Sequence, residues 1–264
     1  MSLVVRSALA LLALAGALPA AAQGFAVQVA PPRFEESARP GTVHRNVIEV
    51  TNSSPAEGRF RLKTADWTLA PDGSVVFSDA LAPGSCRPWV AIEAANLVVA
   101  PSARRRFRFE VAVPADAADG QCRFALVVEG EPEPQPDGSM QVNGRIAIIV
   151  YLTIGNGAPV LTLVETQVQS VQGRDLPVVR IRNTGNAHAR LSGFLDAIGA
   201  DGRRLTLLPS ADPILPGATR DIPLVPVAEN ADAPEPVLSF PLRLKGRLES
   251  PPLRLDVDTD VAKP

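Results

Sequence analysis

The segment from residue 140 to residue 154 constrains the fold of this chain more than any other stretch. It has the composition of one long β-strand, preceded by a Pro-rich segment at 131–136 and followed by Gly155. Side chains alternate between the two faces of a strand. One face collects the apolar residues Met140, Val142, Ile146, Ile148, Val150 and Leu152. The second half is apolar on the other face too, so it must be covered on both faces or pair with a partner.

The first 22 residues have the pattern of a secretory signal peptide. Arg6 supplies a positive charge, residues 8–18 form an apolar core, and residues 20–22 offer the small side chains of a cleavage site. A membrane span takes about 20 apolar residues, and no run in the sequence approaches that length. We therefore expect an exported protein without a transmembrane segment, whose mature chain begins at Gln23.

The charge of the chain excludes some generic partners. The 26 basic residues include Arg6 of the signal, so the mature chain has 25 against 28 acidic residues, a net charge of −3. A nearly neutral chain is not expected to bind nucleic acid or an anionic membrane surface. The basic run at 104–106 is the local exception, and we interpret it as a solvated strand edge.

Two cysteines, Cys86 and Cys122, occur in this exported chain. An oxidising compartment favours a disulfide between them over a metal site or a reactive thiol. Two unpaired buried thiols remain the alternative.

Short Val, Ile, Leu and Phe runs, separated by Pro, Gly, Asn and Asp, predict an all-β chain. In the first half, Phe107 and Phe109 alternate with charged residues and should point inward, and Trp67 is the candidate for a central core aromatic. Seven to eight strands over about 130 residues indicate an immunoglobulin-like sandwich. The expected strands of this half are 25–31, 43–50, 58–69, 75–77, 104–113, 121–130 and 140–154.

The second half repeats this pattern less densely, after an expected joint at 155–159. We predict a second sandwich, and therefore two domains, at 23–155 and 160–258. Its expected strands are 160–171, 178–183, 189–198, 203–208, 219–225, 237–244 and 253–257.

The sequence offers little material for catalysis, metal binding or cofactor binding. His44 and His188 lie in different halves and outside any metal-ligand spacing, and no nucleophile elbow, phosphate loop or dinucleotide fingerprint occurs. The acidic run at 256–260 lacks the glycine and the distal glutamate of a helix-loop-helix calcium site, so it is interpreted as a strand edge. We expect no enzyme, no metal and no cofactor, with a nucleophile assembled from distant loops as the alternative.

Several short motifs occur in an order that resembles the periplasmic pilus chaperones. In the first half they are Val-Ala-Pro-Pro-Arg at 29–33, Val-Thr-Asn at 50–52, Ala-Asp-Trp at 65–67, the run 97–107 and Phe-Ala-Leu at 124–126. The motifs at 179–183 and 214–217 are similar to the second domain of the same family. The resemblance implies two immunoglobulin-like sandwiches set as a boomerang.

The resemblance also implies a mode of binding. In that family the last strand of the first domain completes a pilus subunit by β-augmentation, and two basic residues between the domains hold the subunit's C-terminal carboxylate. Arg33 matches the first basic position. The second, a lysine, is absent, and Arg145 is the candidate substitute, three residues out of alignment. The implied subunit-binding residues are Arg33, Met140, Val142, Arg145, Ile146 and Ile148.

Two functional hypotheses follow. The first is a periplasmic chaperone-like protein that binds exported, fimbrial-type subunits by strand donation, with an outer-membrane usher as a further partner. The second is an immunoglobulin-like structural or adhesive module of the cell envelope or cell surface. The order of the motifs favours the first hypothesis, and the missing lysine favours the second.

Overall fold

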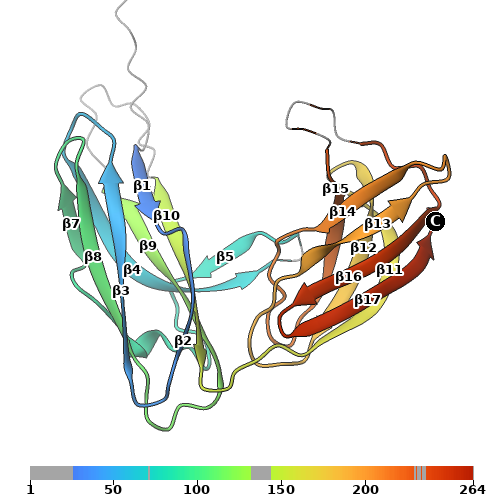
Figure 1. Ribbon diagram of the computed structural model, residues 1–264. Helices are drawn as coiled ribbons and strands as arrows, with labels where there is room; N and C mark the ends of the chain where they lie inside the picture. Colours follow the sequence, from blue (N-terminus) through green and yellow to red (C-terminus); the bar gives the residue numbers. More distant parts are fainter. Residues whose placement is uncertain are drawn as a thin grey trace, which may run out of the picture.

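The computed structural model describes residues 26–70, 72–131, 144–228, 230, 233 and 236–263. The expected signal peptide at 1–22 and the candidate binding residues Met140 and Val142 lie outside these residues. Figure 1 shows that the described chain forms two β-rich arms, which meet at one end and diverge as a V. Among the described residues, no helix is long and apolar enough to cross a membrane.

The N-terminal arm is a sandwich of two sheets. One sheet has the order β1 (Val27–Ala30), β3 (Val43–Asn52), β8 (Arg104–Ala112), β6 (Val90–Ile92). The other has the order β2 (Arg33–Ala38), β10 (Arg145–Ile154), β9 (Gly120–Gly130), β4 (Gly58–Leu69), β5 (Val75–Ser78), with β7 (Asn96–Val99) paired to β4. These orders correspond to the two sheets of an immunoglobulin-like sandwich.

The first strand is shared between the two sheets. β1 pairs with β3 in an antiparallel ladder, whereas β2 pairs with β10 in a parallel one. Pro31 and Pro32 separate the two pieces, and a proline cannot donate to a ladder. The chain therefore changes sheets at this point, and β2 lies beside β10.

The core between these sheets is aromatic and aliphatic. Phe107, Phe109 and Phe124 are fully buried there, and Phe109 meets Phe124 edge to face. The predicted inward alternation of β8 is confirmed. The predicted disulfide is also confirmed, since Cys86 bonds to Cys122 at a sequence separation of 36.

The C-terminal arm contains seven strands in one continuous order. They are β11 (Leu161–Val171), β12 (Arg174–Asn183), β15 (Thr219–Pro226), β14 (Arg204–Pro209), β13 (Ser192–Ile198), β16 (Leu242–Ser250) and β17 (Leu253–Val261). The strands surround a single aliphatic core. The strand β14 pairs with β13 along one edge and with β15 along the other. The chain is thus two immunoglobulin-like sandwiches in tandem, and the exact domain limits 23–155 and 160–258 stay a prediction.

The last two strands of this arm extend further along the chain than the sequence predicts. β16 begins at Leu242 and continues to Ser250, and β17 continues to Val261. The charged residues that interrupt the apolar pattern here pair with each other across the two strands, as Arg247 does with Asp256. Cross-strand ion pairs let a ladder continue where the apolar pattern alone predicts its end.

The expectation that Trp67 lies in the central core is wrong. Trp67 is buried, but it packs on the outer face of the six-stranded sheet with Tyr151 rather than between the two sheets. Phe60 and Leu62 point into the sandwich, and Trp67 lies an odd number of positions further along β4. Alternation therefore directs it to the opposite face. We call this second group the outer cluster, which contains Ala65, Trp67, Ala125, Val127 and Tyr151.

Candidate binding site between the arms

Strand β10 is covered on both faces over its second half. Ile148 and Val150 are buried between the two sheets of the N-terminal sandwich. Ile149 and Tyr151 point the other way and pack in or against the outer cluster. Leu215 of the C-terminal arm packs against the same cluster. The apolar second face is therefore partly an interdomain contact.

The first half of β10 has an open edge. Its neighbour β2 pairs with it only from Ile149 onward, opposite Arg33. Residues Arg145 to Ile148 pair with β9 on one side and with no other described strand on the second. An unpaired edge presents backbone donors and acceptors to another strand. We call this segment, residues 145–148, the open edge.

Hydrogen-bond geometry identifies which backbone groups face outward. The Gly130 amide donates to the Gly144 carbonyl at 3.0 Å, so residue 144 is bonded to β9. Residues of an antiparallel pair alternate between bonded and non-bonded positions. The N–H and C=O groups of Arg145 and Ala147 therefore point to the open edge, while those of Ile146 and Ile148 point to β9.

The predicted binding residues on this strand differ in accessibility. Ile148 has no exposed surface and belongs to the sandwich core, so its side chain is not free to contact a partner. Ile146 is half-buried on the same face. Arg145 is exposed, and its guanidinium lies 5.6 Å from the ring centroid of Phe77 on β5.

The structure does not bring Arg33 and Arg145 together. Arg33 lies opposite Ile149, four residues further along β10 than Arg145. At about 3.3 Å per residue, the two positions are roughly 13 Å apart along the strand direction. Arg33 instead pairs with Glu35, with 2.6 Å between Nε and Oε1.

A network of side chains joins β10 to the C-terminal arm. The ring of Tyr151 stacks on His188, and the side chain of Gln121 bonds to His188 Nδ1 at 2.8 Å. Arg190 donates through Nε to Glu35 Oε1 at 3.0 Å and through Nη2 to the Tyr151 hydroxyl at 3.3 Å. Three neighbouring strands, β2, β9 and β10, therefore contact the second sandwich.

Sequence reasoning missed this network. It interpreted His188 as a strand or turn residue without a functional role, and it assigned no role to Glu35, Gln121 or Arg190. The available signal was weak, namely polar side chains on the otherwise apolar faces of β9 and β10. These residues come from segments that are far apart in the sequence, so their meeting depends on how the arms are placed.

Burial dominates the electrostatics of this junction. It lowers the pKa of His188 to about 4, although the charge of Glu35 opposes the shift. Burial also raises the pKa of Tyr151. For Glu35, burial disfavours the charged form, but the hydrogen bond from Arg190 and the charges of His188 and Arg33 together lower its pKa. At neutral pH His188 is uncharged and Glu35 is ionised.

Arg123 on β9 is an unusual member of this region. It is largely buried, which lowers its pKa, and it makes no ion pair with a described acidic residue. Its guanidinium lies 5.7 Å from the centroid of the Trp67 ring. Arg123 Nη1 and Trp67 Nε1 are both buried, and neither has a hydrogen-bond acceptor within the described part of the chain. A buried donor without an acceptor is costly.

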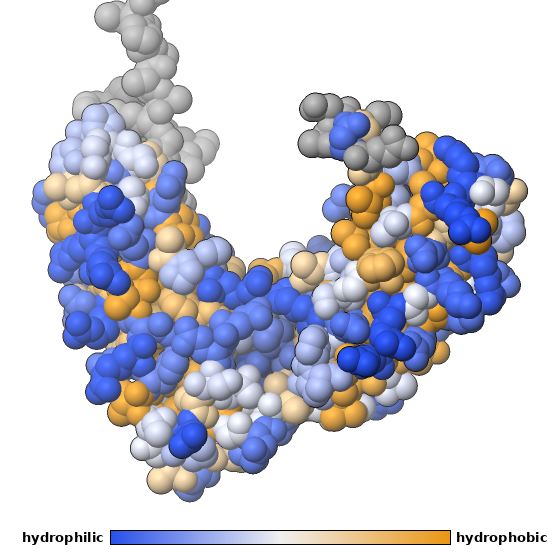
Figure 2. All heavy atoms as spheres, in the orientation of Figure 1, coloured by the Kyte–Doolittle hydropathy of each residue, from blue (hydrophilic) through white to orange (hydrophobic). Residues whose placement is uncertain are grey.

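The β4–β5 hairpin provides a second connection between the arms. In Figure 1 this hairpin extends from the N-terminal arm across to the C-terminal one. Arg220 on β15 donates through Nη1 to the carbonyl of Ala70 at 3.0 Å. The space-filling view in Figure 2 shows a deep concave space between the arms, which we call the hollow.

The segment 155–159 that links the arms is held by its neighbours. Asn156 donates to the Asp119 carboxylate at 3.0 Å, and Asn186 donates to the Asp119 carbonyl at 2.9 Å. A Cβ added at Gly157 would lie 2.4 Å from the carbonyl oxygen of Gly120. The joint is therefore packed against both arms.

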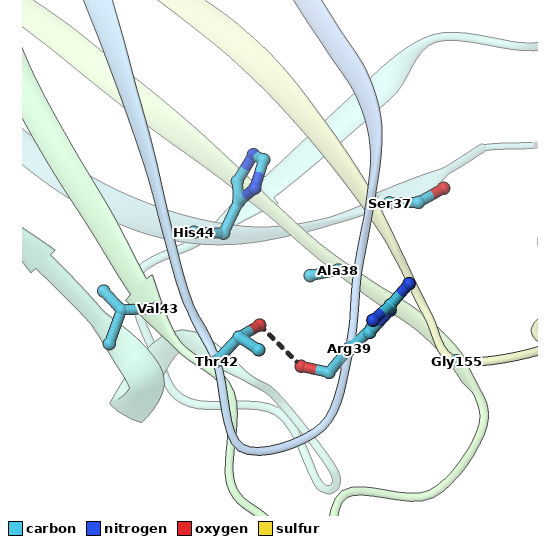
Figure 3. A pocket seen from close by; sticks show the side chains of 7 residues that line it. All are labelled: Ser37, Ala38, Arg39, Thr42, Val43, His44 and Gly155. Carbon is cyan, nitrogen blue, oxygen red and sulfur yellow. Dashed lines mark hydrogen bonds between the residues drawn. The ribbon is translucent and has the colours of Figure 1, made fainter.

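A separate pocket lies beside the turn between β2 and β3, and Figure 3 shows the side chains that line it. Its Thr42 hydroxyl donates to the Arg39 carbonyl, and its His44 contacts Glu36 at 2.6 Å. Within the described ranges, no group of three His, Cys, Asp or Glu residues is placed to hold a metal ion.

No family model and no curated protein sequence matches this chain. Solved structures do match it. A structure of SafA pilin in complex with the SafB chaperone of Salmonella enterica matches at 12% identity, over 90% of this chain and 99% of that one, with a TM-score of 0.49. The chain is similar to solved fimbrial chaperones.

Two further structures show the same similarity. The class 5 fimbriae chaperone CfaA is 11% identical over 83% of this chain and 99% of its own, with a TM-score of 0.48. The CsuC–CsuE chaperone-tip adhesion subunit complex of Acinetobacter baumannii is 15% identical over 90% and 98%, with a TM-score of 0.43. At these identities the similarity concerns the fold.

Proposed function

We propose that this protein is a periplasmic chaperone-like protein that binds exported, β-rich, fimbrial-type subunits through the open edge of β10. The observation that carries the proposal is the pairing of residues 145–148, which pair with β9 on one side and with no other described strand on the second. Adding a strand to such an edge makes main-chain hydrogen bonds that tolerate many partner sequences.

The rest of β10 prepares this edge for binding. The strand pairs with β9 from Arg145 to Ile154, and its second half is buried on both faces. A strand that is already ordered loses little conformational entropy when a partner adds to it. The stack of Tyr151 on His188 extends this support to the second sandwich.

A basic cluster beside the edge is suited to hold a subunit's C-terminal carboxylate. Arg33 is about half exposed, and the side chains of Arg123 and Arg190 lie near the same Tyr151 ring. Arg123 Nη1 also has no hydrogen-bond acceptor among the described residues. We assign the carboxylate to this cluster and not to Arg145. The guanidinium of Arg145 lies over the Phe77 ring, and its position is roughly 13 Å from that of Arg33 along the strand direction.

The experiment coexpresses the full-length chain with candidate exported, β-rich subunits and measures the complexes by copurification. Ala147→Pro removes one outward N–H without touching the bonds to β9, and proline is tolerated at such an edge position. We expect it to abolish the complex. Ala147→Ser keeps the N–H and is the matched control. An intact complex with the folded Ala147→Pro variant rules out strand donation.

The carboxylate assignment has its own comparison. We expect Arg33→Ala to weaken the same complex and Arg145→Ala, an equal loss of charge on the same sheet, to leave it unchanged. Deleting the last residues of the subunit should remove the difference between the two variants. The opposite order of effects would place the anchor at Arg145.

The second candidate is an envelope or surface module that has no subunit partner. The separation of Arg33 from Arg145 and the buried side chain of Ile148 favour it, because neither matches the implied binding residues. Recovery of the protein mainly outside the cell, without any copurifying subunit, would support this function.

A further inference from the structure

The outer face of the C-terminal sandwich is divided into a charged half and an apolar half. On the charged half, Arg243, Lys245 and Arg247 of β16 face three aspartates of β17. Arg247 Nε lies 2.7 Å from Asp256 Oδ1, and Arg243 Nη1 lies 3.2 Å from Asp260 Oδ2. The basic and acidic side chains of this half neutralise each other and remain exposed to solvent. Their charges keep the edge strand β17 from pairing with a strand of another molecule.

The other half exposes large apolar side chains on adjacent strands. Leu195 faces Leu207 in the core, so their neighbours Phe194 and Leu208 emerge together on the outer face. Val227 follows β15 and donates its amide to Thr206 of β14. We call this group the outer apolar patch, and its exposed fractions are Phe194 56%, Leu208 44%, Val227 43% and Ile198 39%.

The patch borders the hollow. Figure 1 places β14 and β15 on the side of the C-terminal arm that faces the N-terminal arm, and Figure 2 shows hydrophobic surface there. The strand β5, which crosses between the arms, also exposes apolar side chains, at Val75 (38%) and Val76 (51%). The strand β10 and the strands β14 and β15 therefore belong to the two arms that flank the hollow.

We propose that the outer apolar patch is a second docking surface for the same exported β-rich subunit that the open edge binds. This inference rests on the proposed function, since it assigns a further contact to its partner. Several large apolar side chains gathered on an otherwise charged face mark a protein contact. When one partner is already bound at the open edge, its contact with the outer apolar patch becomes intramolecular. That second contact therefore forms at a high effective concentration.

The arms are held in a way that keeps both surfaces available together. Tyr151 stacks on His188 at the junction, and Arg220 bonds to the tip of the β4–β5 hairpin. A subunit whose end is paired with residues 145–148 extends into the hollow. Its body then meets the apolar valines of β5 and the patch on the far wall.

The first test measures the affinity of the copurifying subunit for variants of the full-length chain. Burying a side chain of this size is expected to make Leu208→Asp bind about tenfold more weakly. Val164→Asp is the matched control, because Val164 is 54% exposed on β11 of the same sandwich but lies outside the patch. Equal affinities for the two variants overturn the proposal. If Leu208→Asp does not fold, Leu208→Ser is measured against Val164→Ser.

The second test separates this proposal from strand donation. A photoreactive p-benzoylphenylalanine at position 227 is expected to crosslink to the subunit, and one at position 164 is not. Loss of the complex in Ala147→Pro with no crosslink at 227 leaves strand donation standing and overturns the patch. A crosslink at 227 that survives Ala147→Pro overturns strand donation instead. A crosslink from 227 to a second copy of this chain alone overturns the patch as a subunit site.

Discussion

The ring of Tyr151 on β10 stacks on the imidazole of His188 in the second sandwich, with 3.8 Å between ring centroids and 21° between ring planes. Tyr151 follows the open edge by only three residues, so the second sandwich supports the strand proposed to bind subunits. His188 is in turn bonded to Gln121 of β9. Residues of both arms therefore contact the end of β10. Substitutions at this junction are expected to change the stability of that strand.

The junction should make stability depend on pH. The pKa of His188 falls from 6.5 to about 4 on folding, so between these values the unfolded chain binds a proton that the folded chain does not. The free energy of unfolding should therefore decrease as the pH falls from 6.5 toward 4, by about 3 kcal/mol. Urea unfolding at several pH values measures this change.

His188→Gln should flatten that pH dependence. The companion variant Glu35→Gln tests the neighbouring carboxylate, whose folded pKa lies below 4.5 and whose stabilising contribution is lost at lower pH. An unchanged slope between pH 6.5 and 4.5 in His188→Gln would contradict the assignment of the proton to this residue.

Two arginines of the junction should respond in opposite ways to the same substitution. Arg123→Met removes a buried cation that has an unsatisfied Nη1, so the free energy of unfolding should stay equal or rise by about 1 kcal/mol. Arg190→Met removes bonds to Glu35 and Tyr151 and should cost about 1–2 kcal/mol. Chemical unfolding of both variants measures the difference, and a large loss in Arg123→Met would reveal an acceptor for its guanidinium.

The joint between the arms should not tolerate a side chain at position 157. Gly157→Ala places a Cβ against backbone atoms of Gly120 and should cost on the order of 2 kcal/mol. At Gly173 an added Cβ meets nothing within 4 Å, so Gly173→Ala should cost only the roughly 1 kcal/mol of its positive φ. Thermal unfolding compares the two, and small-angle scattering reports whether Gly157→Ala alone changes the angle between the arms.

Removing the disulfide should destabilise the N-terminal sandwich. Cys86 and Cys122 are 36 residues apart in the sequence, which corresponds to about 4 kcal/mol in the chain-entropy model. The double variant Cys86→Ser/Cys122→Ser should lower the urea midpoint by the corresponding amount. Reduction of the unmodified protein with dithiothreitol is the control, and it should reach the same midpoint.

Much of the fold was predictable because strand alternation is a local property. The inward direction of Phe107 and Phe109 and the disulfide followed from local pattern and from the exported context, and both are confirmed. Trp67 was misplaced because its size suggested the core, while its parity along β4 sends it to the outer face.

The candidate site was less predictable because it depends on pairing between distant segments. Residue types identified β10 as apolar on both faces. They did not indicate that β2 stops pairing at Ile149, which leaves residues 145–148 open. The resemblance to the pilus chaperones placed Arg33 and Arg145 in one site, although the parallel register of β2 and β10 separates them.

The sequence by itself determined that this chain is all-β, that it forms two sandwiches, and that the strand ending at Ile154 is apolar on both faces over its second half. The period of two and the spacing of turns are local signals, and each strand carries its own. Only the tertiary structure decided what covers the second face of that strand, through Tyr151 and His188, and which part of its edge stays free. Those answers depend on register and on the placement of one sandwich against the other, which no local pattern encodes.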